Sequence, residues 1–321
     1  VQWDVGYITR KRADLHPDKT AIIFEDQPIT YRALNEGTNR WAHLLLEKGI
    51  RKGDRIAVVL LNCGEFLEAF FGAARVGAIF VPLNWRLTPP ELEYQLNDCG
   101  ARMLLFHDSF LANVDAIRAG IPVEEDKFVF LKSGSPTMPG FELPGCPEWA
   151  EECEALLEGR PTTEPEPEDP VEFDDPLAIL YTSGTTGNPK GAILSHGQTY
   201  FKNFQVAMYS ESTPEDVNIV RLPLFHSGGL FIGATPCLCG GSTMVMRRGF
   251  DPNEFAQDIQ RYRATIVGAL TTMWRMILET GKLDEIDTSS VRRVFGGGER
   301  TPPSMFEELA KRGLQMQQGL G

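Results

Sequence analysis

Short apolar runs with almost no polar interruption alternate with longer mixed segments along the first half of the chain. The runs include Arg55–Asn62 (RIAVVLLN), Arg102–His107 (RMLLFH) and Lys127–Lys132 (KFVFLK). Uninterrupted runs of this length are typical of strands that are covered on both faces. Helices are expected between the strands, at Glu65–Val76 and at residues 109–118. We therefore predict a parallel sheet with helices on both sides.

A second series of the same kind begins after residue 176. Its expected strands are Leu177–Tyr181, Asn218–Leu224, Thr243–Arg247, Thr265–Leu270, Val291–Phe295 and Leu314–Gln318. Its expected helices are Ser195–Tyr209, Asp251–Arg263, Thr271–Thr280 and Ser304–Arg312. The helix at Asp251 has the clearest start, because Pro252 follows this N-cap residue and Glu254 lies in the first turn. Two successive series predict an α/β fold with two doubly wound βα subdomains.

A segment of different composition separates the two series. Residues 161–175 (PTTEPEPEDPVEFDD) contain seven acids, four prolines and no basic residue. This composition favours a solvated connection, and an acidic segment that binds a partner is the alternative. We expect a first α/β subdomain at residues 1–160, the connection at 161–175, and a second α/β subdomain at 176–321 that is incomplete at its C-terminal end.

Composition narrows the possible functions. A net charge of −13 and a pI of about 4.9 oppose binding to nucleic acid or to anionic lipid. No apolar run reaches the ~20 residues that cross a bilayer, and Val1–Arg12 lacks the apolar core of a signal peptide. Six cysteines include no C-x-x-C pair. Cys237 and Cys239 could form a metal or redox pair, but two buried small residues are the favoured interpretation. A cytoplasmic location is expected.

Groups suited to phosphate binding are concentrated in Tyr181–Gly191 (YTSGTTGNPKG). Four hydroxyl side chains and two glycines stand within six residues, and Lys190 follows. Glycines let backbone N–H groups approach an anion, hydroxyls donate to phosphate oxygens or ligate Mg²⁺, and a lysine adds positive charge. The spacing is not that of the Walker loop, because Gly187 follows Gly184 too closely. A polyphosphate ligand would use all of these groups at once.

This string resembles the signature of the adenylate-forming (AMP-binding) superfamily, which comprises acyl-CoA synthetases, peptide-synthetase adenylation domains and beetle luciferases. Further segments resemble the family's other blocks, in the family's order: Ile29–Leu34, Arg75–Asn84, Pro223–His226, Gly296–Glu299 and Gln318–Gly321. The resemblance covers nearly the whole chain. It implies the large N-terminal domain of such an enzyme, with two doubly wound subdomains, flanking helices and a small β subdomain. A mobile C-terminal domain would follow in such an enzyme and is absent from this sequence.

The resemblance implies ATP-dependent activation of a carboxylic acid. The carboxylate attacks the α-phosphorus of ATP, pyrophosphate leaves, and the thiol of CoA then displaces AMP from the acyl-adenylate. Positioned donors and Mg²⁺ matter more than proton transfer in the first step, because the nucleophile is already ionised. The implied cofactors are ATP, Mg²⁺ and the co-substrate CoA, and no side chain of this chain is assigned as a metal ligand.

Each site residue is taken from its match to a family motif. The implied catalytic residues are Thr182, Lys190 and His226. The residues implied for ATP binding are Thr182, Ser183, Gly184, Thr185, Thr186, Gly187, Lys190, Gly297, Gly298, Glu299, Gln318, Gly319, Leu320 and Gly321. The residues implied for the acid are Phe225, His226, Gly228, Gly229, Gly233, Thr272, Trp274 and Gly296. Leu320 departs from the family, which commonly has an aromatic side chain there to stack on adenine.

His226 separates the branches of the family. It stands where amino-acid-activating members carry an Asp that holds the substrate ammonium, so an α-amino acid is disfavoured. His226 itself either lines the carboxylate site or is a core histidine. Trp274 either caps the acyl slot or packs in the core, and Thr271 stands where the family often has Pro. Small and apolar residues in this region favour a fatty or other apolar acid.

The expected protein is therefore an acyl-CoA synthetase of fatty acid and lipid metabolism. An aromatic-acid CoA ligase or a luciferase-like enzyme is less favoured, and monomer and homodimer both remain open. The ribose-binding Asp and the lysine that completes adenylation fall beyond Gly321 in the family. The alternative is thus a catalytically silent fragment that binds nucleotide or acyl groups, and little or no full activity is expected of the chain as given.

Overall fold

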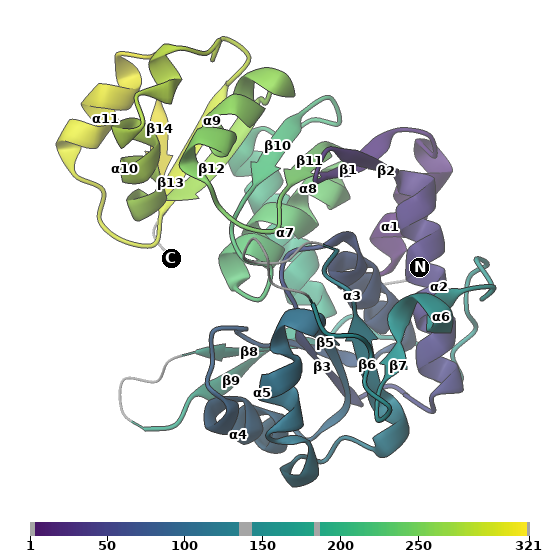
Figure 1. Cartoon of the computed structure of the whole chain (residues 1–321). Helices are drawn as coiled ribbons and strands as arrows, with labels where there is room; N and C mark the ends of the chain where they lie inside the picture. The colour runs from purple at the N-terminus through teal and green to yellow at the C-terminus, as the bar shows by residue number, and fades with distance from the viewer. Residues whose placement is uncertain (1–3, 135–142, 183–186, 320–321) are drawn as a thin grey trace. The chain divides into compact units, whose positions relative to one another are not determined.

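The computed structural model describes residues 4–134, 143–182 and 187–319 of the chain. Contacts divide the chain into two compact units, coloured by residue number in Figure 1. Unit 1 comprises Val1–Asp14 and Arg32–Phe201, and unit 2 comprises Leu15–Tyr31 and Lys202–Gly321. The acidic segment 161–175 thus lies inside unit 1, whereas residues 15–31 belong to unit 2.

Unit 1 is built on a seven-stranded sheet with the strand order β7-β6-β5-β3-β4-β8-β9. Neighbouring strands are parallel except for the antiparallel hairpin of β8 and β9 at one edge. The strands are β3 (Arg55–Val59), β4 (Ile79–Pro82), β5 (Ala101–His107), β6 (Phe128–Leu131), β7 (Glu151–Glu152), β8 (Pro176–Thr182) and β9 (Lys190–Ser195). The helices are α1 (Tyr7–Leu15), α2 (Tyr31–Glu47), α3 (Gly64–Val76), α4 (Pro89–Cys99), α5 (Leu111–Asp115), α6 (Cys153–Leu157) and the first turns of α7 (His196–Ser210).

Unit 2 repeats this plan with the strand order β14-β13-β12-β10-β11-β1-β2. Its antiparallel edge hairpin is formed by β1 and β2, and the other neighbours are parallel. The strands are β1 (Thr20–Phe24), β2 (Gln27–Thr30), β10 (Val217–Val220), β11 (Thr243–Met246), β12 (Ile266–Leu270), β13 (Arg293–Gly297) and β14 (Met316–Gln318). The helices are the rest of α7, the π-helical segment η4 (Gly228–Ala234), α8 (Thr235–Gly240), α9 (Pro252–Arg261), α10 (Thr271–Glu279) and α11 (Pro303–Ala310).

The predicted α/β fold with two doubly wound sheets is confirmed. The apolar strands β4 and β6 are buried at every position, as expected of central strands covered on both faces. Phe80 of β4 packs edge-on against Phe66 and Phe70 of α3, with ring centroids 5.3 and 5.4 Å apart. Hydrophobic burial of this kind, rather than helix propensity, is what holds the amphipathic helices in place.

Several local expectations are corrected. The helix expected at residues 109–118 is only Leu111–Asp115. At its start, residues 108–110 form a 3-10 turn in which the Asp108 carboxylate accepts hydrogen bonds from the backbone N–H groups of Ser109 and Ser133. The hairpin strand β9 was not predicted. All strands of the described residues belong to the two seven-stranded sheets, so the expected small β subdomain is not seen in this part of the chain. None of its helices combines the length and hydrophobicity needed to cross a membrane.

A buried ion network closes the carboxyl ends of two strands in unit 2. Arg221 follows β10, Arg247 follows β11, and both guanidinium groups pair with the buried carboxylate of Asp258 on α9. The Arg221 side chain is fully buried, and that of Asp258 is 2% exposed. Removing one partner of such a pair leaves the other charge buried without compensation, which costs about 3–5 kcal/mol. The network therefore fixes the chain just before residues 222–226.

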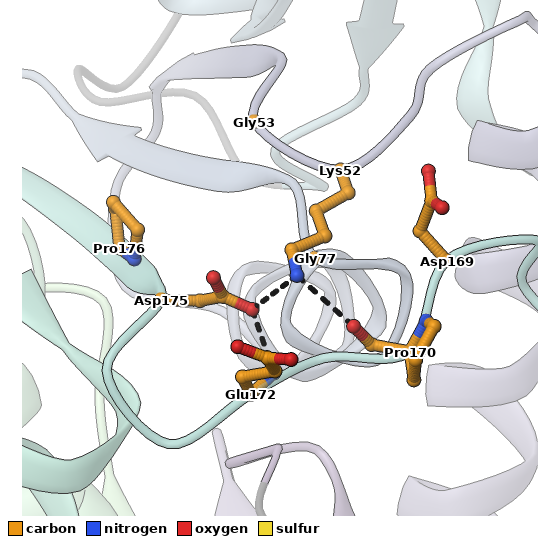
Figure 2. A pocket seen from close by; sticks show the side chains of 8 residues that line it. All are labelled: Lys52, Gly53, Gly77, Asp169, Pro170, Glu172, Asp175 and Pro176. Atoms are coloured by element: carbon orange, nitrogen blue, oxygen red, sulfur yellow. Dashed lines mark hydrogen bonds and ion pairs between the residues drawn. The ribbon is translucent and has the colours of Figure 1, made fainter.

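The acidic segment is fastened to unit 1 by basic side chains. Lys52 forms an ion pair with Asp175 (2.7 Å) and donates to the carbonyl oxygen of Pro170 (3.0 Å), as Figure 2 shows. These residues line a polar cavity of about 540 Å³ together with Asp169 and Glu172. Nearer the start of the segment, Glu164 forms an ion pair with the buried Arg75 (3.0 Å). The segment is thus largely exposed but held at defined points.

His196 links the hairpin to the core of unit 1. It is fully buried at the start of α7, and its Nδ1 accepts a hydrogen bond from the backbone N–H of Val5 (2.9 Å). The ring is therefore neutral, with its proton on Nε2. Burial lowers the pKa of His196 to about 4, although nearby Asp175 acts in the opposite direction.

We predict that His196 makes unit 1 sensitive to acid. An unfolded histidine has a pKa of about 6.5, so between about pH 6.5 and 4 the unfolded chain binds more protons and stability falls as the pH falls. His196→Asn keeps an acceptor for Val5 but does not titrate, and should reduce this loss by up to about 3 kcal/mol. Urea unfolding at several pH values measures the effect. The exposed His16→Asn serves as the control, and an unchanged pH slope in His196→Asn would contradict the prediction.

Candidate functional site

The signature string lies across the tip of the β8–β9 hairpin in unit 1. Thr182 ends β8 and Lys190 begins β9, and the two residues are direct partners in the antiparallel register. Both side chains are exposed, and Gly187 has a φ of +105°, which L side chains rarely adopt. Ser183, Gly184, Thr185 and Thr186 lie outside the described residues. The hairpin thus presents Thr182 and Lys190 side by side at the two ends of the loop.

Helix α4 holds the base of this hairpin through two tyrosine hydroxyls. Tyr181 donates to the carboxylate of Asp98 (2.6 Å), and Tyr94 donates to the carbonyl oxygen of Pro189 (3.3 Å). Burial and the Asp98 carboxylate both raise the pKa of Tyr181, so its hydroxyl keeps its proton. No sequence pattern indicated that Tyr94 and Asp98 support the hairpin, because they lie more than eighty residues before the string.

His226 lies at the carboxyl end of β10 in unit 2. The backbone N–H of Gly228 donates to His226 Nδ1 (3.2 Å), so Nε2 is the ring nitrogen that this bond does not engage. The side chain is exposed, which excludes the core role that the sequence had left open. Its imidazole is therefore accessible to a group outside the protein.

The glycines near His226 allow close packing. A Cβ at Gly229 would lie 2.1 Å from the carbonyl oxygen of Pro223, and a Cβ at Gly233 would lie 3.0 Å from Val220. η4 can therefore approach the chain that leaves β10. This observation gives Gly229 and Gly233 a packing role, whereas the sequence had suggested that they leave open volume for the acid. Phe225 and Gly228 are half-buried in the same turn.

A second loop of unit 2 is formed by bare backbone. Gly296 and Gly297 end β13, and Gly298 has a φ of +84°. The neighbouring strand β14 fastens this turn, because Gly319 N–H donates to Gly296 O (2.9 Å) and Gln318 Nε2 donates to Glu299 O (3.1 Å). The structure thus brings together the glycine turn 296–299 and Gln318–Gly319. Leu320 and Gly321 lie outside the described residues.

Trp274 packs in the hydrophobic core of unit 2, which is one of the two roles considered for it. The ring is fully buried, packs edge-on against Phe255 (5.7 Å) and donates through Nε1 to Phe295 O (2.9 Å). Thr272, its neighbour on α10, is exposed. Trp274 therefore supports the strand that leads into the glycine turn.

The described residues form no cluster of side chains suited to hold a metal ion. Within the described ranges, no group of three or more His, Cys, Asp or Glu side chains is arranged to hold a metal ion. We therefore assign no protein ligand to Mg²⁺ in this part of the chain and derive no step through it. Cys237 is buried, as the favoured interpretation predicted, whereas Cys239 is only partly buried.

Comparison with known proteins identifies the class of protein that this fold and these loops define. The family model described as AMP-binding enzyme matches residues 9–321, and the chain belongs to this family. Among curated relatives, it is 33% identical over 312 residues to an indoleacetate–CoA ligase of Aromatoleum aromaticum and 32% identical over 311 residues to a feruloyl-CoA synthase of an Amycolatopsis species. Each alignment covers 97% of this chain, but only 58% and 57% of the respective relative.

A solved structure supports the same assignment. The inhibitor-bound N-terminal domain of FACL13 from Mycobacterium tuberculosis has 28% sequence identity and a TM-score of 0.82, covering 99% of this chain and 75% of that one. The chain therefore has the fold of the N-terminal domains of adenylate-forming enzymes. It spans a little over half the length of the curated relatives it matches.

We predict that Gly229 cannot be replaced without loss of stability. In Gly229→Ala the new methyl group would overlap the Pro223 carbonyl, and a backbone contact cannot be relieved by a rotamer change. We expect the free energy of unfolding, measured in urea, to fall by about 1–3 kcal/mol. The matched control is Gly240→Ala at the end of α8, where a Cβ meets nothing within 4 Å. Equal stability of the two variants would contradict the prediction.

Proposed function

We propose that this chain carries ATP-binding and acid-binding elements of an enzyme that activates a carboxylic acid as its acyl-adenylate and transfers the acyl group to CoA. The observation that carries the proposal is the hairpin that sets Thr182 opposite Lys190 around the signature string, in a chain of the AMP-binding family. The acid–CoA ligases among its relatives support this class of reaction. Because the chain spans only 57–58% of their length, the activity of the whole protein is part of the proposal.

The first chemical step uses Thr182, Lys190 and His226 in this proposal. The hydroxyl of Thr182 and the ammonium of Lys190 bind the β- and γ-phosphates, so that pyrophosphate leaves as a stabilised anion. A carboxylate oxygen of the acid forms the new bond to the α-phosphorus while the bond to pyrophosphate breaks. No base is needed, since the acid is ionised near neutral pH. His226 is assigned to orient the carboxylate by a hydrogen bond from Nε2, which fits its exposed side chain and the engagement of Nδ1 by Gly228 N–H.

The adenine site is proposed at the glycine turn 296–299. A flat ring can lie against backbone only where no Cβ projects. A Cβ at Gly297 would meet only Gly319 O, at 3.5 Å, so Gly297 is the proposed bare surface, whereas the Cβ directions of Gly296 and Gly298 point at Met316 and Leu270. Glu299 and the paired Gln318–Gly319 segment complete this part of the proposal. Mg²⁺ and CoA enter it as the cofactors that such a reaction requires.

The proposed substrate is an apolar acid. The residue after Phe225 is His226 and not an aspartate, so no carboxylate stands at this position to hold a substrate ammonium. An amino acid substrate is therefore disfavoured. The relatives include ligases named for indoleacetate, for feruloyl groups and for long-chain fatty acids, so aromatic and fatty acids both fall within the proposed class. A role in lipid metabolism and a cytoplasmic location belong to the fatty-acid form of the proposal.

The proposal is tested by ligand-induced stabilisation of the 321-residue chain. Non-hydrolysable acyl-adenylate analogues with graded aliphatic chains, aromatic groups or an aminoacyl group are added at about 100 times their dissociation constant, which should stabilise by about 2.7 kcal/mol. We expect aliphatic or aromatic analogues to raise the melting temperature by several degrees and the aminoacyl analogue to have no effect. Stabilisation only by the aminoacyl analogue would reject the apolar acid. No shift with any analogue would reject acyl-adenylate binding by this chain.

We predict that Lys190→Ala separates phosphate binding from adenine binding. Loss of one charge-assisted contact should weaken ATP and tripolyphosphate binding about tenfold or more. The affinity for AMP should change less than about twofold, because AMP lacks the β- and γ-phosphates. Isothermal titration calorimetry measures all three, with the exposed Lys311→Ala as the control. An equal loss for AMP and ATP would show that Lys190 does not act on the terminal phosphates.

A further inference from the structure

Thr271 is the first residue of α10 and is fully buried at the carboxyl end of β12. Its hydroxyl faces the glycine turn of the neighbouring strand β13. Thr271 Oγ1 lies 2.8 Å from Thr301 Oγ1 and 3.3 Å from Glu299 O, with Gly297 O at 3.5 Å. One side chain on α10 therefore contacts residues on both sides of Gly298.

The two threonine hydroxyls fit a single hydrogen-bond chain. Each hydroxyl has one proton to donate and can accept from another group. Thr301 donates to Thr271, and Thr271 in turn donates to Glu299 O, which is the arrangement that satisfies both buried hydroxyls. Thr301 is only 3% exposed, so water does not replace this contact.

The glycine turn depends on its neighbours for a fixed position. Glycine has no side chain to limit its backbone, and Gly298 adopts a positive φ. From the side of β14, Gln318 Nε2 reaches Glu299 O (3.1 Å). From the opposite neighbour, β12 and α10, Thr271 reaches the same oxygen. The Glu299 carbonyl is thus held from both sides, and the Thr271 bond is the one made through a buried hydroxyl.

We propose that Thr271 is a positioning residue for nucleotide binding, which fixes the glycine turn so that its backbone meets adenine in one geometry. This inference rests on the proposed function of the turn as the adenine site. Thr271 acts through the turn and not by contact with the nucleotide.

The test compares AMP with tripolyphosphate, because the two ligands report on different loops. In Thr271→Val the hydroxyl is replaced by a methyl group of similar size, and we expect AMP to bind at least about fivefold more weakly. Tripolyphosphate binding, which depends on the β8–β9 hairpin, should stay within about twofold. Thr271→Ser keeps the hydroxyl and should bind AMP as the unaltered chain does.

Thr280→Val is the matched control for a purely structural effect. Thr280 ends the same helix, and its hydroxyl donates to Ile277 O (2.7 Å) without touching the turn. Calorimetric titration of all variants is combined with hydrogen exchange of the amides at residues 297–300, which should exchange faster only in Thr271→Val. If Thr271→Val does not fold, Thr301→Val removes the donor to Thr271 and should weaken AMP binding in the same direction.

The outcomes separate the inference from the proposed function. AMP affinity equal in Thr271→Val and the unaltered chain overturns the inference alone. An equal loss of AMP and tripolyphosphate affinity, or an equal loss in Thr280→Val, also overturns it, because the effect is then a general loss of structure. If the unaltered chain binds no AMP, the proposed adenine site falls, and the inference falls with it.

Discussion

The parallel direction of the strands is the constraint on which the rest of unit 2 depends. Parallel strands all end at the same edge of a sheet, so the loops that follow them are neighbours there regardless of their separation in sequence. The turn with His226 follows β10, Thr271 follows β12, and the glycine turn follows β13. The register pairs Leu270 with Gly297 and Gly296 with Gln318, which brings the residues that follow β12 and β14 within hydrogen-bonding distance of the glycine turn.

Placing several loops at one edge requires that the backbones approach closely, and glycine is used for this in two ways. At Gly229 the carbonyl of Pro223 occupies the space of a Cβ, so glycine allows packing. At Gly298 the backbone itself has a positive φ, so glycine allows the turn. The freedom that glycine brings must then be removed by neighbouring groups, and buried hydroxyl and amide side chains from the adjacent strands do this.

The two units stabilise their loops by different physical means. In unit 1, tyrosine hydroxyls of α4 and β8 hold a hairpin whose outer strand is mostly exposed. In unit 2, the ends of β10 and β11 are held by Arg221, Arg247 and the buried Asp258. Such buried charges are weak evidence for high stability, but losing one of them is costly. The edge that carries His226 is therefore defined by a network that tolerates little change.

The sequence by itself determined the fold class, the order of most strands and helices, and the family. Apolar runs such as Arg102–His107 identify central strands because both faces of such strands are buried, and that requirement is local. The string Tyr181–Gly191 identifies the family because its chemistry is contiguous. The start of α5 was not predictable from a local pattern, since Asp108 in the 3-10 turn before it binds Ser133, twenty-five residues away in sequence.

Only the tertiary structure decided how individual side chains are used. It showed that Trp274 packs in the core, that His226 is exposed and accepts the Gly228 N–H at Nδ1, and that Tyr94 and Asp98 support the hairpin. It also placed residues 15–31 in the second sheet, because β1 pairs with β11 more than two hundred residues later. The physical reason is common to all of these: they depend on contacts between segments distant in sequence, and no local pattern of residues records which segments will meet.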